Sequence, residues 1–321
     1  MKLSIVVPIY KRVDEIKSFF ENISNQTSKD FELIIILDAN KEKEINLIIP
    51  LIKKEPKRFK LIFNTKRRGY SKTINTAFKD ASGEYVLIIN TSDKLKSKIG
   101  VSSIISEIKK ANNPDILEFP LLIRGILRWN PELRVYTPKA TKITEVPNFI
   151  AKTMPTLVNK VFKKEKFLSI TYLNNNKNKN SKFIFETLYS EMILIDDLTV
   201  AVSKSKLIKV YISKYAPCLN PTTLSKEWKS IFSLSDSNDH KYFEELLYAS
   251  LFHKVIFISK LVFAYKVKIM TNKNWKNITD FFNKWENELK NNTYILFNSK
   301  ENKALQNVRT LTELKKIMKD F

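Results

Sequence analysis

The sequence predicts an α/β domain with a mostly parallel central sheet over residues 1–120, because short apolar runs alternate there with segments of helical periodicity. A strand that is buried on both faces has a continuous apolar run, whereas a helix that covers it has apolar residues at every third or fourth position. Both patterns recur in this part of the chain. In such sheets ligands bind outside the carboxyl ends of the strands, so the residues at those ends are the first functional candidates.

Five apolar runs are expected to form the strands. They are Leu3–Ile9, Glu32–Leu37, Phe59–Phe63, Glu84–Asn90 and Asp115–Phe119. Helices are expected between them, around residues 13–23 and 45–52 and over Ser71–Ala81 and Ile99–Lys110. Gly83 separates the third of these helices from the fourth strand. The strand ends are Pro8–Arg12, Asp38–Lys41, Asn64–Gly69 and Asn90–Leu95.

The second half of the chain divides into an irregular part and a helical part. Between residues 121 and 215 the periodicity is weak, and the tract Asn174–Lys182 is almost entirely Asn, Lys and Ser, which is typical of a mobile loop. Beyond Ser225 the spacing of apolar residues is helical over residues 247–265, 275–285 and Leu311–Met318. We therefore expect a helical C-terminal extension.

The formal net charge of +23 over 321 residues indicates a partner of acidic chemistry, such as nucleic acid, anionic lipid or nucleotide phosphate. Most of the basic residues are lysines, so compositional bias of the source genome stays open as an alternative. Nucleic acid is the least favoured partner, because the sequence has no zinc-finger spacing, recognition-helix signature or RNA-binding aromatic motif.

The single cysteine, Cys218, excludes an intramolecular disulfide and a cysteine zinc site and fits a reducing compartment. His240 and His253 are too few and too isolated for a histidine metal site. The start of the chain lacks a signal-peptide pattern, and the longest candidate for a membrane span, Leu246–Ile269, is interrupted by a histidine and four lysines. We expect a cytoplasmic protein, with peripheral attachment to the inner face of the cell membrane as an alternative.

Four segments together resemble the family 2 glycosyltransferases, which have the GT-A fold of nucleotide-diphosphosugar transferases. Leu3-Ser-Ile-Val-Val-Pro-Ile-Tyr10 resembles the first strand and nucleotide loop of that family. Asp30-Phe-Glu-Leu-Ile-Ile-Ile-Leu-Asp38 resembles its second strand, which ends in the acidic residue that meets the base. Gly69-Tyr-Ser-Lys-Thr-Ile-Asn75 and Ala81-Ser-Gly-Glu-Tyr-Val-Leu-Ile-Ile-Asn-Thr-Ser-Asp93 resemble its glycine turn, its helix and the strand that leads to the metal motif.

The resemblance continues on the acceptor side, where Val158–Phe167, Tyr189-Ser-Glu191 and Tyr215–Ser225 follow the order of the family's elements. It implies a GT-A domain with a mostly parallel central sheet over residues 1–224. Residues 1–120 would be its nucleotide-binding half and residues 121–224 its acceptor-side half. The helical extension would then comprise residues 225–321.

The resemblance also implies an activity. Members of the family transfer a sugar from a nucleotide sugar, here expected to be UDP-linked, to a saccharide or lipid-linked hydroxyl with inversion at the anomeric carbon. Such enzymes build surface glycans and glycolipids in bacteria. A divalent cation, Mn²⁺ or Mg²⁺, bridges the diphosphate and neutralises the leaving group. A carboxylate removes the proton from the attacking hydroxyl.

The resemblance assigns roles to eleven positions of this chain. Glu191 is the expected base, and Asp93 is the expected metal ligand. The expected nucleotide-sugar contacts are Pro8, Ile9, Tyr10, Asp38, Lys72, Asn75, Asn90, Thr91 and Ser92. For three of these residues a simpler role stays open: Asp38 and Asp93 are also placed to cap a following helix, and Glu191 to be a solvated helix residue.

Several chemistry-bearing positions depart from the family pattern. Asn90-Thr-Ser-Asp93 stands where the family usually has Asp-x-Asp-Asp, and Ser190-Glu191 stands where it has Glu-Asp. Ile74 replaces a frequent Arg, and Ala39-Asn40 replaces an Asp or Gly after the base-reading Asp. Two interpretations follow. Either a variant site is active, with Lys66, Arg67, Arg68 and Lys72 assisting the diphosphate, or the chain is a non-catalytic GT-A module.

The basic clusters Lys53–Lys60, Lys160–Lys166 and Lys204–Lys209 have three open explanations. They suit docking on anionic lipid, binding of a polyanionic acceptor, or simple solvation of the surface. A lipid-surface adaptor without nucleotide dependence is therefore a third functional class. Lys160 matches a lysine of the family and is expected either to orient acceptor or phosphate or to lie on the surface. The aromatic C-terminal helices are a candidate subunit interface.

Overall fold

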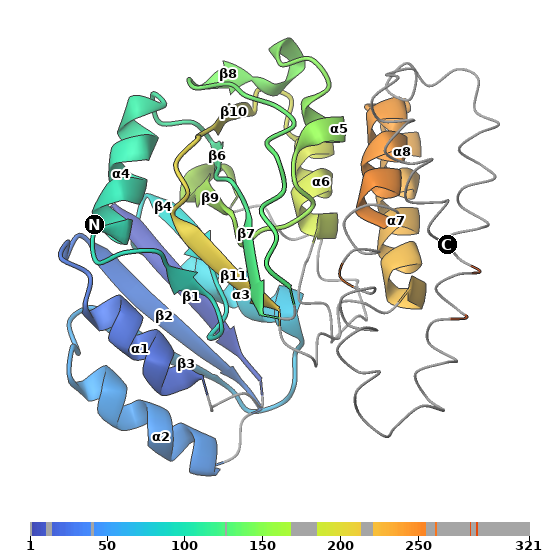
Figure 1. The fold of residues 1–321 in the computed structure, drawn as a ribbon. Coiled ribbons are helices and arrows are strands. Elements are labelled where there is room, and N and C mark those ends of the chain that lie inside the picture. Colours follow the sequence, from blue (N-terminus) through green and yellow to red (C-terminus); the bar gives the residue numbers. More distant parts are fainter. Residues whose placement is uncertain are drawn as a thin grey trace.

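The computed structural model describes residues 2–10, 15–39, 42–125, 127–167, 185–212 and 221–254, with the single residues Leu261, Asn283 and Asn287. Its larger sheet comprises β1 (Leu3–Ile9), β2 (Phe31–Asp38), β3 (Phe59–Asn64), β4 (Tyr85–Ile88), β6 (Ile116–Glu118), β8 (Thr141–Lys142), β9 (Lys160–Lys163) and β10 (Thr199–Val202). In the described residues these strands are ordered β3-β2-β1-β4-β9-β6-β10-β8 (Figure 1). A smaller sheet of β5 (Lys94–Leu95), β7 (Leu122–Gly125) and β11 (Ile208–Ile212) has the order β5-β11-β7.

The described helices surround these sheets. They are α1 (Ile16–Ser24), α2 (Glu42–Lys53), α3 (Tyr70–Asp80), α4 (Gly100–Lys110), α5 (Phe149–Lys152), α6 (Phe185–Leu194), α7 (Pro221–Asp236) and α8 (Phe243–Leu251), with short 3-10 turns at Ile143–Glu145 and Lys164–Lys166. None of the helices in these ranges is long and apolar enough to cross a membrane.

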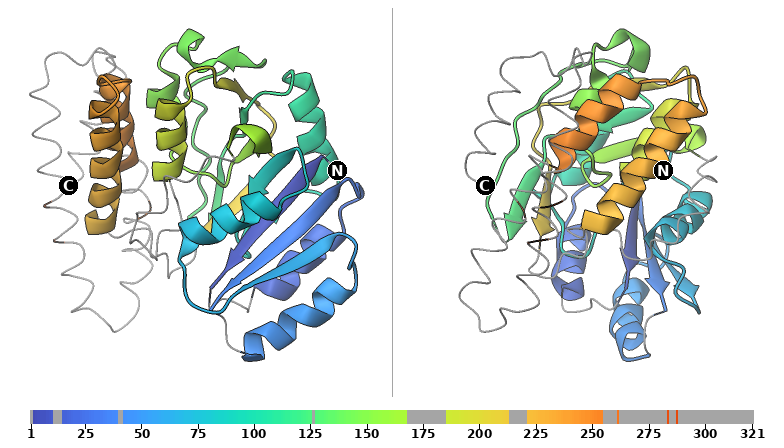
Figure 2. Two further views of the ribbon diagram at one scale, coloured as in Figure 1. Left: turned by 180° about the vertical axis from the view of Figure 1, so that it is seen from behind. Right: turned by 90° about the vertical axis from the view of Figure 1, so that its right-hand side faces the viewer.

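The N-terminal half follows from its alternation of strands and helices. The strands β3, β2, β1 and β4 are parallel neighbours, and every residue of β2 is buried, as a continuous apolar run requires. The chain moves outward from β1 to β3 and then crosses back to β4. Since parallel crossovers are right-handed, α1 and α2 cover one face of the sheet and α3 covers the other (Figures 1 and 2).

Gly83 fixes the approach to β4. A Cβ at this position would lie 2.6 Å from the backbone nitrogen of Ser4, so the close packing of the turn against β1 requires a glycine. The buried carboxylate of Glu32 stabilises this turn, because it accepts hydrogen bonds from the Ser4 hydroxyl at 2.6 Å and from the Gly83 amide at 3.2 Å. The separation of helix and strand that the sequence predicted at Gly83 is confirmed.

Residues 121–224 add antiparallel strands that the sequence did not predict. The strand β9 lies between β4 and β6 and is antiparallel to both, whereas β10 is parallel to β6. The sheet is nevertheless mostly parallel, as predicted. In the smaller sheet β11 pairs antiparallel with β5 and parallel with β7, so it joins the segment after β4 to the acceptor-side half.

The first part of the helical extension is confirmed, since α7 and α8 pack against α6 and α5 (Figure 1). Trp228 of α7 lies 5.1 Å from the ring of Tyr189 of α6, and its indole donates a hydrogen bond to Nδ1 of His253 at 3.1 Å. Burial lowers the pKa of His253 to about 3, which keeps this imidazole neutral as a packing residue. The tract Asn174–Lys182 and the helices predicted over 275–285 and Leu311–Met318 lie outside the described residues.

Candidate functional site

The carboxyl ends of the four parallel strands bring the predicted nucleotide contacts to one edge of the sheet. The register pairs Ile9 with Leu37, directly before Asp38, and pairs Asp38 with Asn64 at the end of β3. On the other side of β1, the amide of Ile89 donates to the carbonyl of Val6 at 3.1 Å and so aligns the segment that begins at Asn90. This is the edge at which open α/β sheets bind ligands.

Asp38 organises the loop that precedes α3. Its carboxylate accepts hydrogen bonds from the backbone amides of Arg68 at 2.7 Å and Gly69 at 2.9 Å, and from the side chain of Asn64 at 3.3 Å. Gly69 has a φ of 86°, which a residue with a side chain rarely adopts. Asp38 therefore fixes the loop that precedes α3, and one acceptor position of its carboxylate remains. Whether it also caps α2 stays a prediction, because residues 40 and 41 lie outside the described residues.

Asn64 is a site residue that the sequence analysis did not assign. Its side chain is buried between the carboxylate of Asp38 and the hydroxyl of Thr73, to which it donates at 3.2 Å. The signal was present, because Asn64 ends the third strand as Asp38 ends the second. A polar residue at the end of each neighbouring strand marks the same edge of a parallel sheet.

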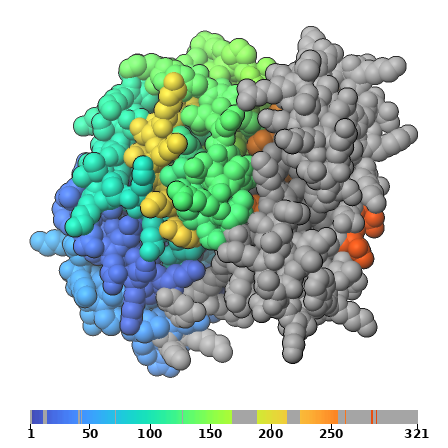
Figure 3. All heavy atoms as spheres, viewed as in Figure 1, coloured from blue at the N-terminus to red at the C-terminus, as the bar shows by residue number. Residues whose placement is uncertain are grey.

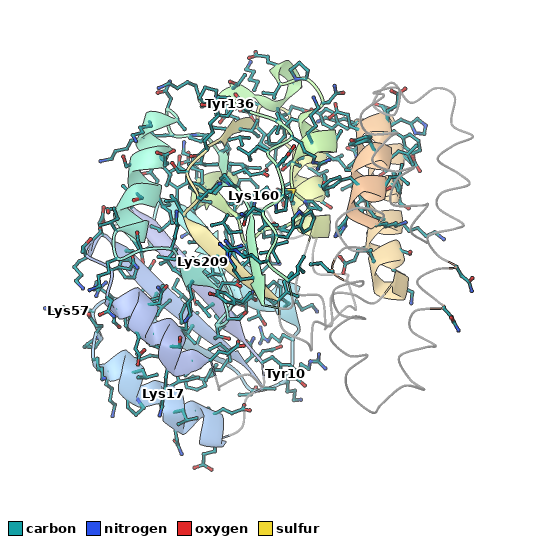
Figure 4. The ribbon with its side chains drawn as sticks, in the orientation of Figure 1. Tyr10, Lys17, Lys57, Tyr136, Lys160 and Lys209 are labelled. Atoms are coloured by element: carbon teal, nitrogen blue, oxygen red, sulfur yellow. The ribbon has the colours of Figure 1, made fainter. Side chains whose placement is uncertain are left out.

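Basic groups gather beside this edge. The guanidinium of Arg67 lies 4.3 Å from the centroid of the Tyr10 ring, in cation–π distance (Figure 4 labels Tyr10). The side chains of Lys66, Arg68 and Lys72, which are close to it in the sequence, are exposed. Basic groups of this kind can supply positive charge to a phosphate ligand.

The remaining predicted nucleotide-sugar contacts differ in the exposure of their side chains. Pro8, Tyr10 and Asn75 are partly exposed, so their side chains are accessible. Ile9, Thr91 and Ser92 are buried, and Ser92 donates through its hydroxyl to the carbonyl of Tyr211 at 3.3 Å.

Asp93 closes the turn that follows β4. One carboxylate oxygen accepts hydrogen bonds from the backbone amide and the side-chain amide of Asn90, both at 2.8 Å. The other accepts from the amide of Tyr211 on β11 at 3.0 Å. The hydroxyl of Tyr70 reaches the side-chain oxygen of Asn90 at 3.4 Å, and burial together with the charge of Asp93 raises the pKa of Tyr70.

The described residues do not fit the cation site that the resemblance implied. The side chain of Asp93 is 0% exposed, and three donors already occupy most of the acceptor capacity of its carboxylate. Mn²⁺ and Mg²⁺ require free oxygen ligands, and in the described ranges no three His, Cys, Asp or Glu side chains gather into a metal-binding group. We therefore derive no chemical step through a cation.

Glu191 lies in the middle of α6 and is buried, with 3% of its surface exposed. The residues on both sides of it, from Leu188 to Ile193, are also buried, so the solvated-helix alternative is wrong. Burial raises the pKa of the Glu191 carboxyl to about 7, where a group exchanges protons near neutral pH. A buried carboxyl with this pKa is a candidate general base.

The neighbouring carboxylates lack this environment. Asp196 and Asp197 are exposed and lie in ion pairs with Lys241 at 2.5 Å and Lys166 at 3.0 Å. Their ion pairs make them structural surface residues rather than candidate bases.

Both expectations for Lys160 are wrong. It is the first residue of β9, near the centre of Figure 4, and its side chain is fully buried rather than at the surface. The ammonium donates to the carbonyls of Met154 at 2.6 Å and Thr156 at 2.8 Å and lies 3.4 Å from the carboxylate of Glu118. Burial lowers the pKa of Lys160 to about 8, so this lysine is part of an internal polar network of the acceptor-side half.

Known proteins with similar sequences include glycosyltransferases. Residues 4–112 match the model of Glycosyl transferase family 2. The GalNAc(5)-diNAcBac-PP-undecaprenol beta-1,3-glucosyltransferase of Campylobacter jejuni is 30% identical over 112 residues, which are 35% of this chain and 35% of that protein. The teichoic acid poly(glycerol phosphate) polymerase of Staphylococcus epidermidis is 28% identical over 120 residues, which are 37% of this chain and 16% of that protein. The matched segment thus spans well under two thirds of these relatives.

Solved structures show the same fold over most of the chain. S. aureus TarS 1–349 in complex with UDP-GlcNAc has a TM-score of 0.62 at 16% identity and covers 80% of this chain and 73% of its own. The mannosyltransferase PcManGT from Pyrobaculum calidifontis, in complex with GDP-Man and Mn²⁺, has a TM-score of 0.53 at 14% identity. The match covers 94% of this chain and 88% of that protein's chain. The predicted GT-A fold is confirmed.

Proposed function

Because the chain belongs to the family 2 glycosyltransferases, we propose that it transfers a sugar from a nucleotide sugar to the hydroxyl of a saccharide or lipid-linked acceptor. The donor is UDP-linked, the transfer inverts the anomeric carbon, and the product is a bacterial surface glycan or glycolipid. The observation that carries this proposal is Glu191, a buried carboxyl with a pKa of about 7 on the acceptor-side half of a GT-A fold. The names of the relatives support the type of product.

The donor binds at the carboxyl edge of β1–β4. Asp38 contacts the base, while Pro8, Ile9 and Tyr10 line the nucleotide with side chain or backbone. Asn75, Asn90, Thr91 and Ser92 contact ribose and diphosphate. Positive charge comes from Lys72 and from the Arg67 guanidinium held over Tyr10, which stabilises the departing nucleoside diphosphate.

Glu191 acts as the base. Its carboxylate takes the proton of the acceptor hydroxyl as the acceptor oxygen forms a bond to the anomeric carbon. The bond from that carbon to the diphosphate oxygen breaks at the same time, and the nucleoside diphosphate leaves with the electron pair. Because the displacement is in line, the configuration of the anomeric carbon inverts.

The test is donor turnover by Glu191→Ala beside Glu245→Gln. Glu245 is the matched control, because it is also a carboxyl whose pKa burial raises, but it lies on α8 and accepts the amide of Ala151. We expect Glu191→Ala to lower turnover about 10²–10⁴-fold while UDP binding stays unchanged. Turnover equal to that of the unmodified chain would exclude Glu191 as the base.

The alternative is a non-catalytic GT-A module that binds a partner or glycan. The turn closed by Asp93 favours it, since a carboxylate engaged by three donors is not available for transfer chemistry. This alternative predicts nucleotide binding without turnover for any donor, and substitution of Glu191 would then change nothing.

A lipid-linked acceptor would place the protein at a membrane surface, so we propose a peripheral position at the inner face of the cell membrane. Assembly through the C-terminal helices stays a prediction, and the aromatic segment 275–285 lies almost entirely outside the described residues.

A further inference from the structure

Two lysine-rich segments that are distant in the sequence lie side by side in the smaller sheet. Residues 94–98 and 204–209 meet where β5 pairs antiparallel with β11, with Leu95 opposite Ile208. The pairing continues beyond the strands, since the amide of Lys96 donates to the carbonyl of Leu207 at 2.8 Å. The lysines of both segments therefore share one part of the surface.

Four of these lysines are exposed and form what we call the lysine ridge: Lys96, Lys98, Lys204 and Lys206. In the ranges that the structure describes, none of the four takes part in an ion pair. Some lysines elsewhere are neutralised, as in the pairs of Lys60 with Glu32 and Lys166 with Asp197, whereas others, such as Lys53, Lys54 and Lys57, are exposed like those of the ridge. The ridge thus concentrates uncompensated positive charge. Figure 3 shows the chain around residues 200–212, in yellow, on the viewed surface.

Exposed apolar side chains stand directly beside the ridge. Ile99 follows Lys98 and is 56% exposed, and Tyr136 is 51% exposed with the ammonium of Lys204 lying 4.1 Å from its ring centroid (Figure 4 labels Tyr136). Among the described residues, these are the two most exposed large hydrophobic side chains. Their position beside four exposed lysines combines positive charge and accessible apolar surface in one part of the molecule.

We propose that the lysine ridge, together with Ile99 and Tyr136, docks the protein on an anionic membrane surface. Each near-surface lysine contributes about 1 kcal/mol of attraction to anionic headgroups, and apolar side chains add to this by entering the boundary between headgroups and acyl chains. A soluble polyanion satisfies the lysines but gains little from the apolar pair. The combination therefore favours a lipid surface.

The ridge lies close to the proposed donor site along the chain. Lys94, the first residue of β5, directly follows Asp93, and the carboxylate of Asp93 is bonded to Tyr211 of the strand that carries Lys209. In space, however, the ridge extends away from that site, because the carbonyl of Lys98 accepts a hydrogen bond from the amide of Thr27 at 2.9 Å, on the segment that enters the amino end of β2. The docking surface therefore does not rest on the proposed function.

The experiment is co-sedimentation of the full chain with vesicles of phosphatidylcholine alone or mixed with phosphatidylglycerol. The test variant replaces the four ridge lysines by glutamine. The matched control replaces Lys53, Lys54, Lys57 and Lys79, which are exposed elsewhere, so both variants lose the same charge. Figure 4 shows Lys57 on a part of the surface remote from Tyr136. A third variant, Ile99→Ser with Tyr136→Ser, removes the apolar groups at constant charge.

We expect the ridge variant to bind the mixed vesicles at least about tenfold more weakly, the apolar variant to bind them several-fold more weakly, and the control to bind almost normally. Equal losses in ridge and control variants would overturn the proposal, because net charge alone would then explain binding. The proposal would also fail if the apolar variant bound vesicles normally while the ridge variant lost binding to soluble polyphosphate. UDP titration of each variant reports separately on the donor site and on folding.

Discussion

The carboxylate of Asp93 accepts a hydrogen bond from the backbone amide of Tyr211 at 3.0 Å, across 118 positions of the sequence. With its other oxygen on both amides of Asn90, this side chain ties the end of β4 to the smaller sheet. The residue expected to bind a cation therefore holds together the two halves of the proposed site.

Asp93→Ala should lower the free energy of unfolding by about 3 kcal/mol or more, because it leaves three buried donors without their acceptor. Urea denaturation followed by circular dichroism measures this loss. Asp80→Ala at the exposed end of α3 is the control and should change stability by less than about 0.5 kcal/mol. A loss of under about 1 kcal/mol in Asp93→Ala would contradict the structural role.

Glu191→Gln should stabilise the protein at high pH. The folded pKa of about 7 lies above the ordinary value of 4.5, so the contribution of this group to stability is complete below pH 4.5 and is lost as the pH rises through 7. Glutamine cannot ionise and keeps that contribution, which is about 3 kcal/mol above pH 7. Denaturation of both proteins should show stabilities that coincide below pH 4.5, diverge between pH 4.5 and 7, and then differ by a constant amount. Parallel curves would mean that Glu191 has an ordinary pKa.

The same pKa predicts how turnover depends on pH. A base must be deprotonated to act, so kcat/KM should rise as the pH passes through about 7 and then level off. The measurement is the initial rate of transfer, at acceptor concentrations well below KM, over a series of buffers. A rate that is already maximal at pH 5, well below this pKa, would point to a different proton acceptor.

Gly83→Ala should destabilise the N-terminal half, because the new Cβ would lie 2.6 Å from both the nitrogen and the hydroxyl oxygen of Ser4. Overpacking of this kind costs about 1–3 kcal/mol, and thermal unfolding measures it as a lower Tm. Ser82→Ala, at the exposed neighbouring position, is the comparison and should have a much smaller effect. Equal Tm values for the two variants would show that the turn can shift without cost.

The sequence was sufficient for the parts of the fold that depend on local pattern. The continuous apolar run of β2 and the break at Gly83 predicted elements that the structure contains. A strand buried on both faces requires apolar residues throughout, and the close approach of two backbones requires a glycine. Ala39, which departs from the family pattern, has an unusual backbone conformation. Its φ of 57° lies in the left-handed region that favours the Gly or Asp usual at that position.

Long-range pairing was beyond such reasoning. Lys160 looked like a surface or site residue, yet β9 inserts between β4 and β6 and buries it against Glu118. The tie from Asp93 to Tyr211 depends on β11 returning beside β5, which no local periodicity encodes. These contacts decide which polar groups are free for a ligand, so the candidate site was less predictable than the sheet that carries it.

Titration calorimetry with UDP, in EDTA and then in excess Mn²⁺, tests the central claim most directly. Since Asp93 is committed to Asn90 and Tyr211 while Arg67 and Lys72 supply charge, we predict that UDP binds in EDTA and that Mn²⁺ changes its Kd by less than about threefold, a difference below 1 kcal/mol. Binding that appears only with Mn²⁺ would contradict the described geometry of Asp93. No binding of UDP or of any other nucleoside diphosphate under either condition would contradict the nucleotide-sugar site itself.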